Sequence, residues 1–172
     1  MLVFAIIAAA VVIVDQVSKY LISVNLPEPG DTIPVIKDVL HLTRVNNEGA
    51  AFGMLSNQRW IFMVLSVVAI IGLTVWAAVY IVKTKNTWML LSAAFVVGGG
   101  IGNMVDRIWH GYVIDFIDCR FINFYVFNVA DSFVTIGCIL LVICLVVEEI
   151  KGIRARKAAE AEEEDGEDDG TV

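Results

Sequence analysis

Residues 98–131 read GGGIGNMVDRIWHGYVIDFIDCRFINFYVFNVAD. This segment begins inside one apolar run, ends where the next apolar run starts, and contains four aspartates and two arginines. Charged side chains are rare inside lipid and usually have a function there. If the flanking runs cross a membrane, these side chains are the first candidates for chemistry.

The composition is that of a membrane protein. Of the 172 residues, 58% are hydrophobic and the mean hydropathy is +0.77, whereas soluble domains are roughly 45–50% apolar. The net charge of −7 arises at the end of the chain, because residues 158–172 hold eight acids and no base. Such a segment has little apolar surface to bury. We therefore predict one membrane domain, residues 1–157, and a disordered acidic cytoplasmic tail, residues 158–172.

Four apolar runs have the length of a membrane-spanning helix, which needs about 20 residues. They cover residues 2–23, 61–82, 87–109 and 130–150. The first run lacks the basic residues that begin a signal peptide, so we interpret it as a retained span. Lysine and arginine gather between the second and third runs and after the fourth, which favours the cytoplasmic side for both places. We predict an α-helical integral membrane protein, a four-transmembrane-helix bundle with both termini in the cytoplasm.

The segment between the first two spans, residues 25–60, would then lie outside. Its start contains three prolines and a glycine, which disfavour helix. Residues 35–45, VIKDVLHLTRV, alternate and are rich in β-branched side chains, which favours short strands. We predict a small extracytoplasmic β-containing segment between helices 1 and 2, lying on the membrane.

The third span carries small residues at intervals of four, Ala94, Gly98 and Gly102. They share one helical face and would let a neighbouring helix approach closely. The glycines do not form a dinucleotide-binding loop, because GxGxxG would require glycine where Asn103 stands, and no strand precedes them.

Two sets of polar residues in the spans have ready partners. Asp15 and Lys19 lie four apart on one helical face and can form an ion pair. The pair either orients its helix in the bundle or supports a nearby site, and both interpretations stay open. Asn103, Asp106 and Arg107 share a face near the outer end of the third span, where we expect a structural or supporting role.

Asp115 and Asp131 differ because neither has a base in its local window. Asp115 lies in the apolar segment YVIDFI, and Asp131 begins the fourth span. An apolar setting raises a carboxyl pKa, and two carboxyls at one site can divide into a protonated and an ionised partner. Such a pair can activate water for peptide hydrolysis. The alternatives are a helix cap at Asp131, a small transporter or ion pathway that uses the same aspartates, and a structural membrane subunit.

Other chemistries lack their residues. His41 and His110 are far apart in the sequence and form no HExxH motif, and no GxSxG motif is present. The three cysteines have no CxxC spacing. A basic patch for nucleic acid is also missing, so we expect no nucleic-acid partner.

Five short motifs follow one another along the chain. They are Asp15-Gln16 with Lys19; residues 47–53, NEGAAFG; residues 99–107, GGIGNMVDR; residues 113–116, VIDF; and residues 127–132, FNVADS. The motifs and their order resemble those of the lipoprotein signal peptidase family, also called signal peptidase II.

The resemblance implies an aspartic endopeptidase of the bacterial cytoplasmic (inner) membrane that cleaves prolipoproteins on the amino side of a diacylglyceryl-modified cysteine. It implies that Asp115 and Asp131 are the catalytic dyad, at the extracytoplasmic face. It assigns Asn47, Gly49, Asn103, Arg107 and Asn128 to the substrate site, with Asp15, Lys19 and Asp106 supporting them.

The resemblance also implies partners. These are diacylglyceryl prolipoproteins, membrane lipid and the cyclic peptide inhibitor globomycin, with no metal or organic cofactor, and we expect a monomer. We further predict that the outer segment holds the substrate as an extended strand, because sheet edges offer backbone hydrogen-bonding groups.

Overall fold

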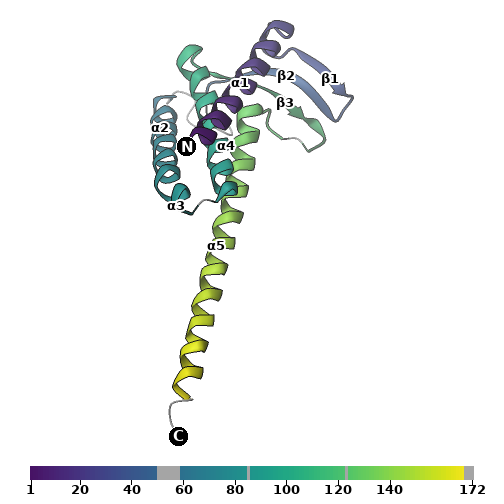
Figure 1. Cartoon of the computed structure of the whole chain (residues 1–172). Coiled ribbons are helices and arrows are strands. Elements are labelled where there is room, and N and C mark those ends of the chain that lie inside the picture. Colours follow the sequence, from purple (N-terminus) through teal and green to yellow (C-terminus); the bar gives the residue numbers. More distant parts are fainter. Residues whose placement is uncertain (50–58, 85, 123, 169–172) are drawn as a thin grey trace.

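The computed structural model describes residues 1–49, 59–84, 86–122 and 124–168. Its elements are, in chain order, α1 (Leu2–Asn25), β1 (Thr32–Ile36), β2 (Leu40–Asn47), α2 (Arg59–Trp76), η2 (Ala77–Ile81), α3 (Val82–Thr84), α4 (Thr87–Trp109), β3 (Val113–Cys119), η3 (Arg120–Ile122) and α5 (Val129–Asp168). Helix α4 is central, since α1, α2 and α5 all pack against it. The three strands lie together at one end of this bundle (Figure 1).

Four helical segments of the described chain are long and apolar enough to cross a membrane. They are Leu2–Asn25, Met63–Tyr80, Thr87–Trp109 and Val129–Ala159. The prediction of an α-helical four-span membrane protein is therefore confirmed, with the third span at the predicted residues. The second span is α-helical only to Trp76 and continues as the π-helical segment η2.

The sheet is antiparallel with the order β1-β2-β3. Strands β1 and β2 confirm the predicted β-containing segment between helices 1 and 2. The third strand comes from the connection between α4 and α5, which the sequence identified only as an extended apolar segment. In the β2–β3 pairing, Val45 lies opposite Asp115 and Asn47 lies opposite Val113. This register brings the end of β2 to the strand that carries Asp115.

Glycines in α4 permit the close packing of three helices. A Cβ atom on Gly98 would lie 2.8 Å from the backbone oxygen of Ala8 in α1, and one on Gly99 would lie 2.5 Å from that of Ala130 in α5. Ala94 on the same helix is fully buried. The predicted small-residue face is therefore a contact with α1, and Gly99 adds a second contact with α5.

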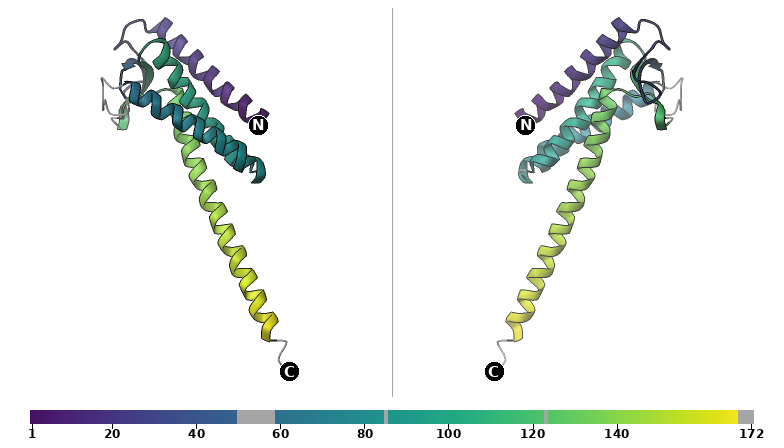
Figure 2. Two further views of the ribbon diagram at one scale, coloured as in Figure 1. Left: turned by 90° about the vertical axis from the view of Figure 1, so that its left-hand side faces the viewer. Right: turned by 90° about the vertical axis from the view of Figure 1, so that its right-hand side faces the viewer.

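Helix α5 extends far beyond the other helices (Figures 1 and 2). Its 40 residues, at 1.5 Å each, span about 60 Å, roughly twice the thickness of a bilayer's hydrocarbon core. The sequence predicted disorder from residue 158, whereas the helix continues to Asp168. Alanine and glutamate have high helix propensity, which allows a helix to continue without a core to pack on. The division into a membrane domain and a tail stays a prediction.

Candidate active site

A cavity of about 880 Å³ lies where β2, β3, the C-terminal half of α4 and the start of α5 meet. Much of its wall is apolar and includes Val113, Phe127, Val134 and Ile136. Its other wall residues include Gly49 and the polar residues Asn47, Glu48, Asn103, Arg107, Asp115 and Asp131. The structure thus brings both predicted dyad aspartates to one cavity, together with four of the five residues assigned to the substrate site.

Asn128 and Asp131 form the start of α5. The backbone N–H of Asp131 donates to Asn128 Oδ1 (2.9 Å), and the backbone N–H of Asn128 donates to Asp131 Oδ2 (3.2 Å). These reciprocal bonds are a capping box, which satisfies two backbone donors that a helix N-terminus leaves free. Asn128 is therefore the N-cap residue, and Asp131 is the third residue of the helix rather than its cap.

The side chain of Asn128 also joins the two aspartates. Its Nδ2 atom donates to Asp115 Oδ1 (2.6 Å) and to Asn103 Oδ1 (3.0 Å). Asn103 Nδ2 in turn donates to Asp131 Oδ1 (2.7 Å). Asn128 is fully buried, so it supports the cavity wall from behind. Two asparagines thus fix the carboxylates of Asp115 and Asp131 relative to each other.

Asp115 is buried in β3, with 2% of its surface exposed. Burial raises the pKa of its carboxyl from 3.8 to about 6, and the negative charge of Asp131 acts in the same direction. The hydrogen bonds from Asn47 Nδ2 (2.8 Å to Oδ2) and from Asn128 oppose this rise. At neutral pH a carboxyl of this kind can exchange a proton with a reacting group, as a general acid or base must.

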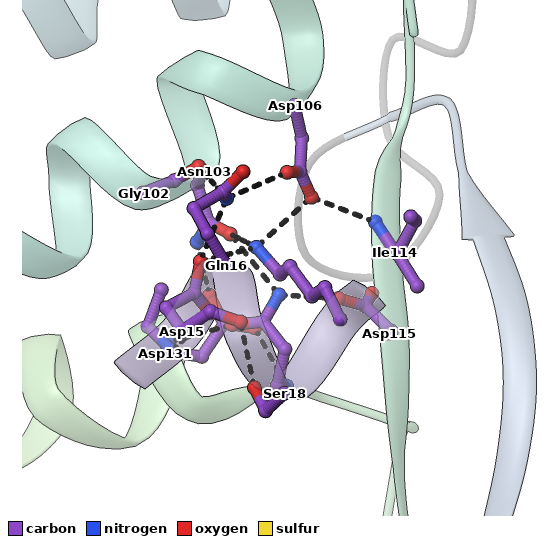
Figure 3. A network of polar contacts seen from close by, with 12 residues as sticks. Asp15, Gln16, Ser18, Gly102, Asn103, Asp106, Ile114, Asp115 and Asp131 are labelled. Atoms are coloured by element: carbon purple, nitrogen blue, oxygen red, sulfur yellow. Dashed lines mark hydrogen bonds and ion pairs between the residues drawn. The ribbon is translucent and has the colours of Figure 1, made fainter. Parts of the chain in front are cut away.

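A buried ion cluster contacts Asn103, and Figure 3 labels its two carboxylates, Asp15 and Asp106. Lys19 Nζ contacts Asp15 Oδ2 (2.8 Å) and Asp106 Oδ2 (2.9 Å), and it donates to Asn103 Oδ1 (3.0 Å). None of the three charged side chains is more than 2% exposed. The expected contact between Asp15 and Lys19 is present, and through Asn103 it reaches the site.

Arg107 supplies positive charge at the cavity. Its guanidinium donates to the backbone oxygen of Asn103 in its own helix (3.3 Å). Within the ranges that the structure describes, Arg107 forms no salt bridge. Its other N–H groups can therefore meet a ligand in the cavity.

Comparison with known proteins identifies the family. Residues 7–147 match the family model described as signal peptidase (SPase) II. This chain belongs to the signal peptidase II family. It is 43% identical over 140 residues to the lipoprotein signal peptidase of Brevibacillus brevis, with 81% of this chain and 92% of the relative covered. It is also 43% identical over 148 residues to that of Halothermothrix orenii, with 86% and 97% covered.

Solved structures agree with this assignment. One bacterial membrane enzyme superposes with a TM-score of 0.80 at 35% identity, covering 87% of this chain and 90% of the other. A second superposes with a TM-score of 0.76 at 36% identity, covering 84% and 93%. The arrangement of helices and sheet is therefore that of solved membrane enzymes.

In this signal peptidase II chain, sequence reasoning missed two kinds of contact. Gln16 Nε2 donates to Asp106 Oδ1 (2.9 Å), although Gln16 was noted only as part of a motif. The carboxylates of Asp15 and Asp106 also accept backbone N–H groups, from Ala130 (2.9 Å) and Ile114 (3.1 Å). Only the adjacency of Gln16 to Asp15 in a motif hinted at the first contact, and nothing in the sequence indicated the others.

Several residues considered at the sequence level lie elsewhere. His41 is buried near Thr32, and His110 lies beside Tyr112 at the end of α4. Neither histidine lines the cavity. Among the residues with described positions, no three His, Cys, Asp or Glu side chains are grouped so that they could hold a metal ion. Residues 50–53 of the second motif of the signal peptidase II pattern lie outside the described residues.

Proposed function

We propose that this chain is an aspartic endopeptidase that removes signal peptides from membrane-bound prolipoproteins. Cleavage would occur on the amino side of a diacylglyceryl-modified cysteine. The observation that carries the proposal is the pair Asp115 and Asp131, which line one cavity and are joined through Asn128. The relatives' name, lipoprotein signal peptidase, supports the substrate class.

The environments of the two aspartates suggest which of them is the acid and which is the base. Burial favours the neutral form of Asp115. Asp131 accepts hydrogen bonds at both carboxylate oxygens and lies in the first turn of α5, where the helix dipole favours negative charge. We assign the shared proton to Asp115, which leaves Asp131 to act as the base.

This assignment gives a complete hydrolytic cycle. Asp131 takes a proton from water while the protonated Asp115 donates a hydrogen bond to the scissile carbonyl oxygen. The water oxygen bonds to the carbonyl carbon, which becomes tetrahedral. Asp131 then passes its proton to the departing amine as the C–N bond breaks, and the dyad returns to its starting state. Arg107 is placed to stabilise negative charge on the carbonyl oxygen.

The predicted strand pairing of substrate with the outer segment, residues 25–60, stays a prediction. The β3 edge beside the cavity is a different edge, and several of its backbone donors are occupied. The N–H of Ile114 donates to Asp106, and those of Phe116 and Ile117 donate to the backbone oxygen of Phe127. These backbone donors are therefore already engaged. At the β3 edge, we propose that side chains such as Asn47 and Arg107 supply most of the polar contacts to the peptide.

The position of the cavity in the bundle fits a lipid-anchored substrate. The cavity lies where α4 ends and α5 begins, and the lysines and arginines gather at the opposite ends of these helices. By the charge rule the opposite ends are cytoplasmic. We propose that the cavity opens at the extracytoplasmic face of the bacterial membrane, where a diacylated cysteine would hold the scissile bond, and that both termini are cytoplasmic.

The decisive experiment compares two precursor peptides, one with a diacylglyceryl cysteine and its unlipidated twin. The protein in lipid nanodiscs should cleave the first alone, and mass spectrometry should place the cut before the cysteine. Asp115→Asn and Asp131→Asn should each abolish cleavage and still elute as folded protein in size-exclusion chromatography. Asp118→Asn is the control and should cleave normally, since Asp118 does not line the cavity.

Two outcomes would count against the proposal. Near-normal turnover by either dyad variant would remove the dyad assignment. If the wild-type protein left both peptides intact while it changed proton or solute flux in sealed vesicles, the transporter alternative would be favoured.

A further inference from the structure

The ion cluster of Asp15, Lys19 and Asp106 makes bonds that an ion pair alone does not require. Asp15 Oδ1 accepts the backbone N–H of Ala130, the residue immediately before Asp131. Asp106 Oδ2 accepts the backbone N–H of Ile114, the residue immediately before Asp115. Each carboxylate of the cluster therefore holds the backbone next to one dyad aspartate.

We propose that this cluster is a positioning device that sets the separation of the two dyad carboxylates. The inference rests on the proposed role of Asp115 and Asp131. Lys19 is the hub, because its ammonium contacts Asp15, Asp106 and Asn103 at 2.8–3.0 Å. An ammonium has three donors, so all of them are used and its position is fixed.

The two anchored N–H groups lie at places where no backbone carbonyl oxygen of the same element can accept their hydrogen bonds. Ala130 is in the first turn of α5, where a helix leaves its N–H groups without internal partners. Ile114 donates across the side of β3 that no further strand of the described sheet covers. A side-chain acceptor is therefore needed at both places, and α1 and α4 each supply one from the same ion cluster.

The packing around Asp15 is built for this contact. A Cβ atom on Gly102 would lie 2.7 Å from Asp15 Oδ2, so only glycine lets the carboxylate pass α4 on its way to α5. The cluster is also enclosed, with no charged side chain more than 2% exposed. Removal of Lys19 would leave two buried carboxylates without their cation, and removal of either aspartate would leave one backbone N–H without its acceptor.

The proposal separates the effects of alanine and asparagine at these positions. Asparagine keeps a carbonyl oxygen that can accept the backbone N–H, whereas alanine removes the acceptor. We expect Asp106→Ala and Asp15→Ala to lower kcat by about tenfold to hundredfold, as loss of supporting contacts commonly does, with KM unchanged. Asp106→Asn should recover part of kcat. Lys19→Met should match the alanine variants, because it releases both carboxylates.

A second measurement does not depend on cleavage. Amide hydrogen exchange, followed by NMR of the protein labelled with ¹⁵N isoleucine and alanine in nanodiscs, reports the anchored N–H groups directly. Exchange at Ile114 should accelerate in Asp106→Ala, exchange at Ala130 in Asp15→Ala, and both in Lys19→Met. Asp118→Asn should change neither the exchange nor kcat, because the Asp118 carboxylate accepts from Thr43 and Arg120, which lie outside the ion cluster.

The positioning role and the proposed function can be refuted separately. Unchanged exchange at both amides in Lys19→Met, or unchanged kcat in a folded Asp106→Ala protein, would overturn the positioning device. Accelerated exchange with loss of the thermal transition and no asparagine rescue would indicate a structural role and also overturn it. If the wild-type protein failed to cleave any lipidated precursor while the exchange pattern appeared as expected, the proposed function would be wrong and the anchoring right.

Discussion

Replacement of Asp115 by asparagine should change how stability depends on pH. The carboxyl of Asp115 is buried and its pKa is raised from 3.8 to about 6. Asparagine has nearly the same shape but does not titrate. The variant therefore removes one proton equilibrium while it leaves the cavity wall in place.

The sign follows from proton linkage. Between pH 3.8 and about 6 the folded state holds the Asp115 proton more tightly than the unfolded state does, so stability falls as pH rises through this window. At about 1.4 kcal/mol for each pKa unit, the wild-type protein loses about 3 kcal/mol between pH 3.5 and pH 7 through this group. Asp115→Asn should not show this loss. Because asparagine also turns one amide toward the donor Asn47 or Asn128, a constant offset between the two proteins is expected at every pH.

The assay is thermal unfolding of the detergent-solubilised proteins across pH 3.5 to 7.5, with the difference between wild type and variant plotted against pH. The difference should move in favour of the variant by about 6–12 °C over the window, taking about 2–4 °C per kcal/mol for a protein of this size. Asp118→Asn is a control of opposite sign. Burial raises the pKa of the Asp118 carboxyl, but the hydrogen bonds from Arg120 and Thr43 and the charge of Arg120 outweigh this and lower it. Parallel curves for wild type and Asp115→Asn would refute the reasoning.

Two further predictions concern packing and catalysis. Gly99→Ala should destabilise the protein by about 1–3 kcal/mol, because its Cβ would lie 2.5 Å from a backbone oxygen of α5. Gly100→Ala should be near neutral, because its Cβ would meet the side chain of Ile70, Cγ1 at 3.2 Å and Cδ1 at 3.3 Å, which can shift slightly. Equal unfolding temperatures of the two variants would contradict this. For wild-type cleavage, kcat/KM should decline as pH rises above about 6, because the free enzyme then loses the proton of Asp115. A kcat/KM profile that is flat from pH 5 to 8 would be inconsistent with the proposed proton assignment.

The helices could be predicted from the sequence because a membrane span is a local property. About 20 apolar residues suffice, and the residues of the third span were located as they occur in α4. The third strand could not be placed in the same way. Its partner, β2, is separated from it by about 68 residues, as the contact between Asn47 and Asp115 shows. Alternation reveals that a segment is extended, but it does not reveal which strand it joins.

The continuation of α5 escaped prediction for a different reason. Residues 158–172 hold eight acids and little apolar surface, and this composition predicted disorder because such a segment has little surface to bury. Helix propensity and burial are separate contributions. A segment rich in alanine and glutamate that follows a helix already formed has no nucleation cost, so the helix can extend to Asp168.

At the site, the sequence singled out Asp115 and Asp131 because no cation lies near them along the chain. That test works only for neighbours in sequence. Asn128 and Asn103 join the two carboxylates from different elements, and the backbone contacts of Asp15 and Asp106 depend on where α5 and β3 arrive in space. These contacts are products of the fold and have no local signature.

The most instructive residue is Asp131, for which a helix cap and a catalytic base were set against each other as alternatives. The structure combines helix capping with a place on the cavity wall. Asp131 Oδ2 accepts the backbone N–H of Asn128 in the capping box, while Oδ1 accepts Asn103 Nδ2. The same bonds that stabilise the start of α5 hold the carboxylate at the cavity wall. A structural explanation of a carboxylate at a helix terminus therefore does not exclude the proposed catalytic one.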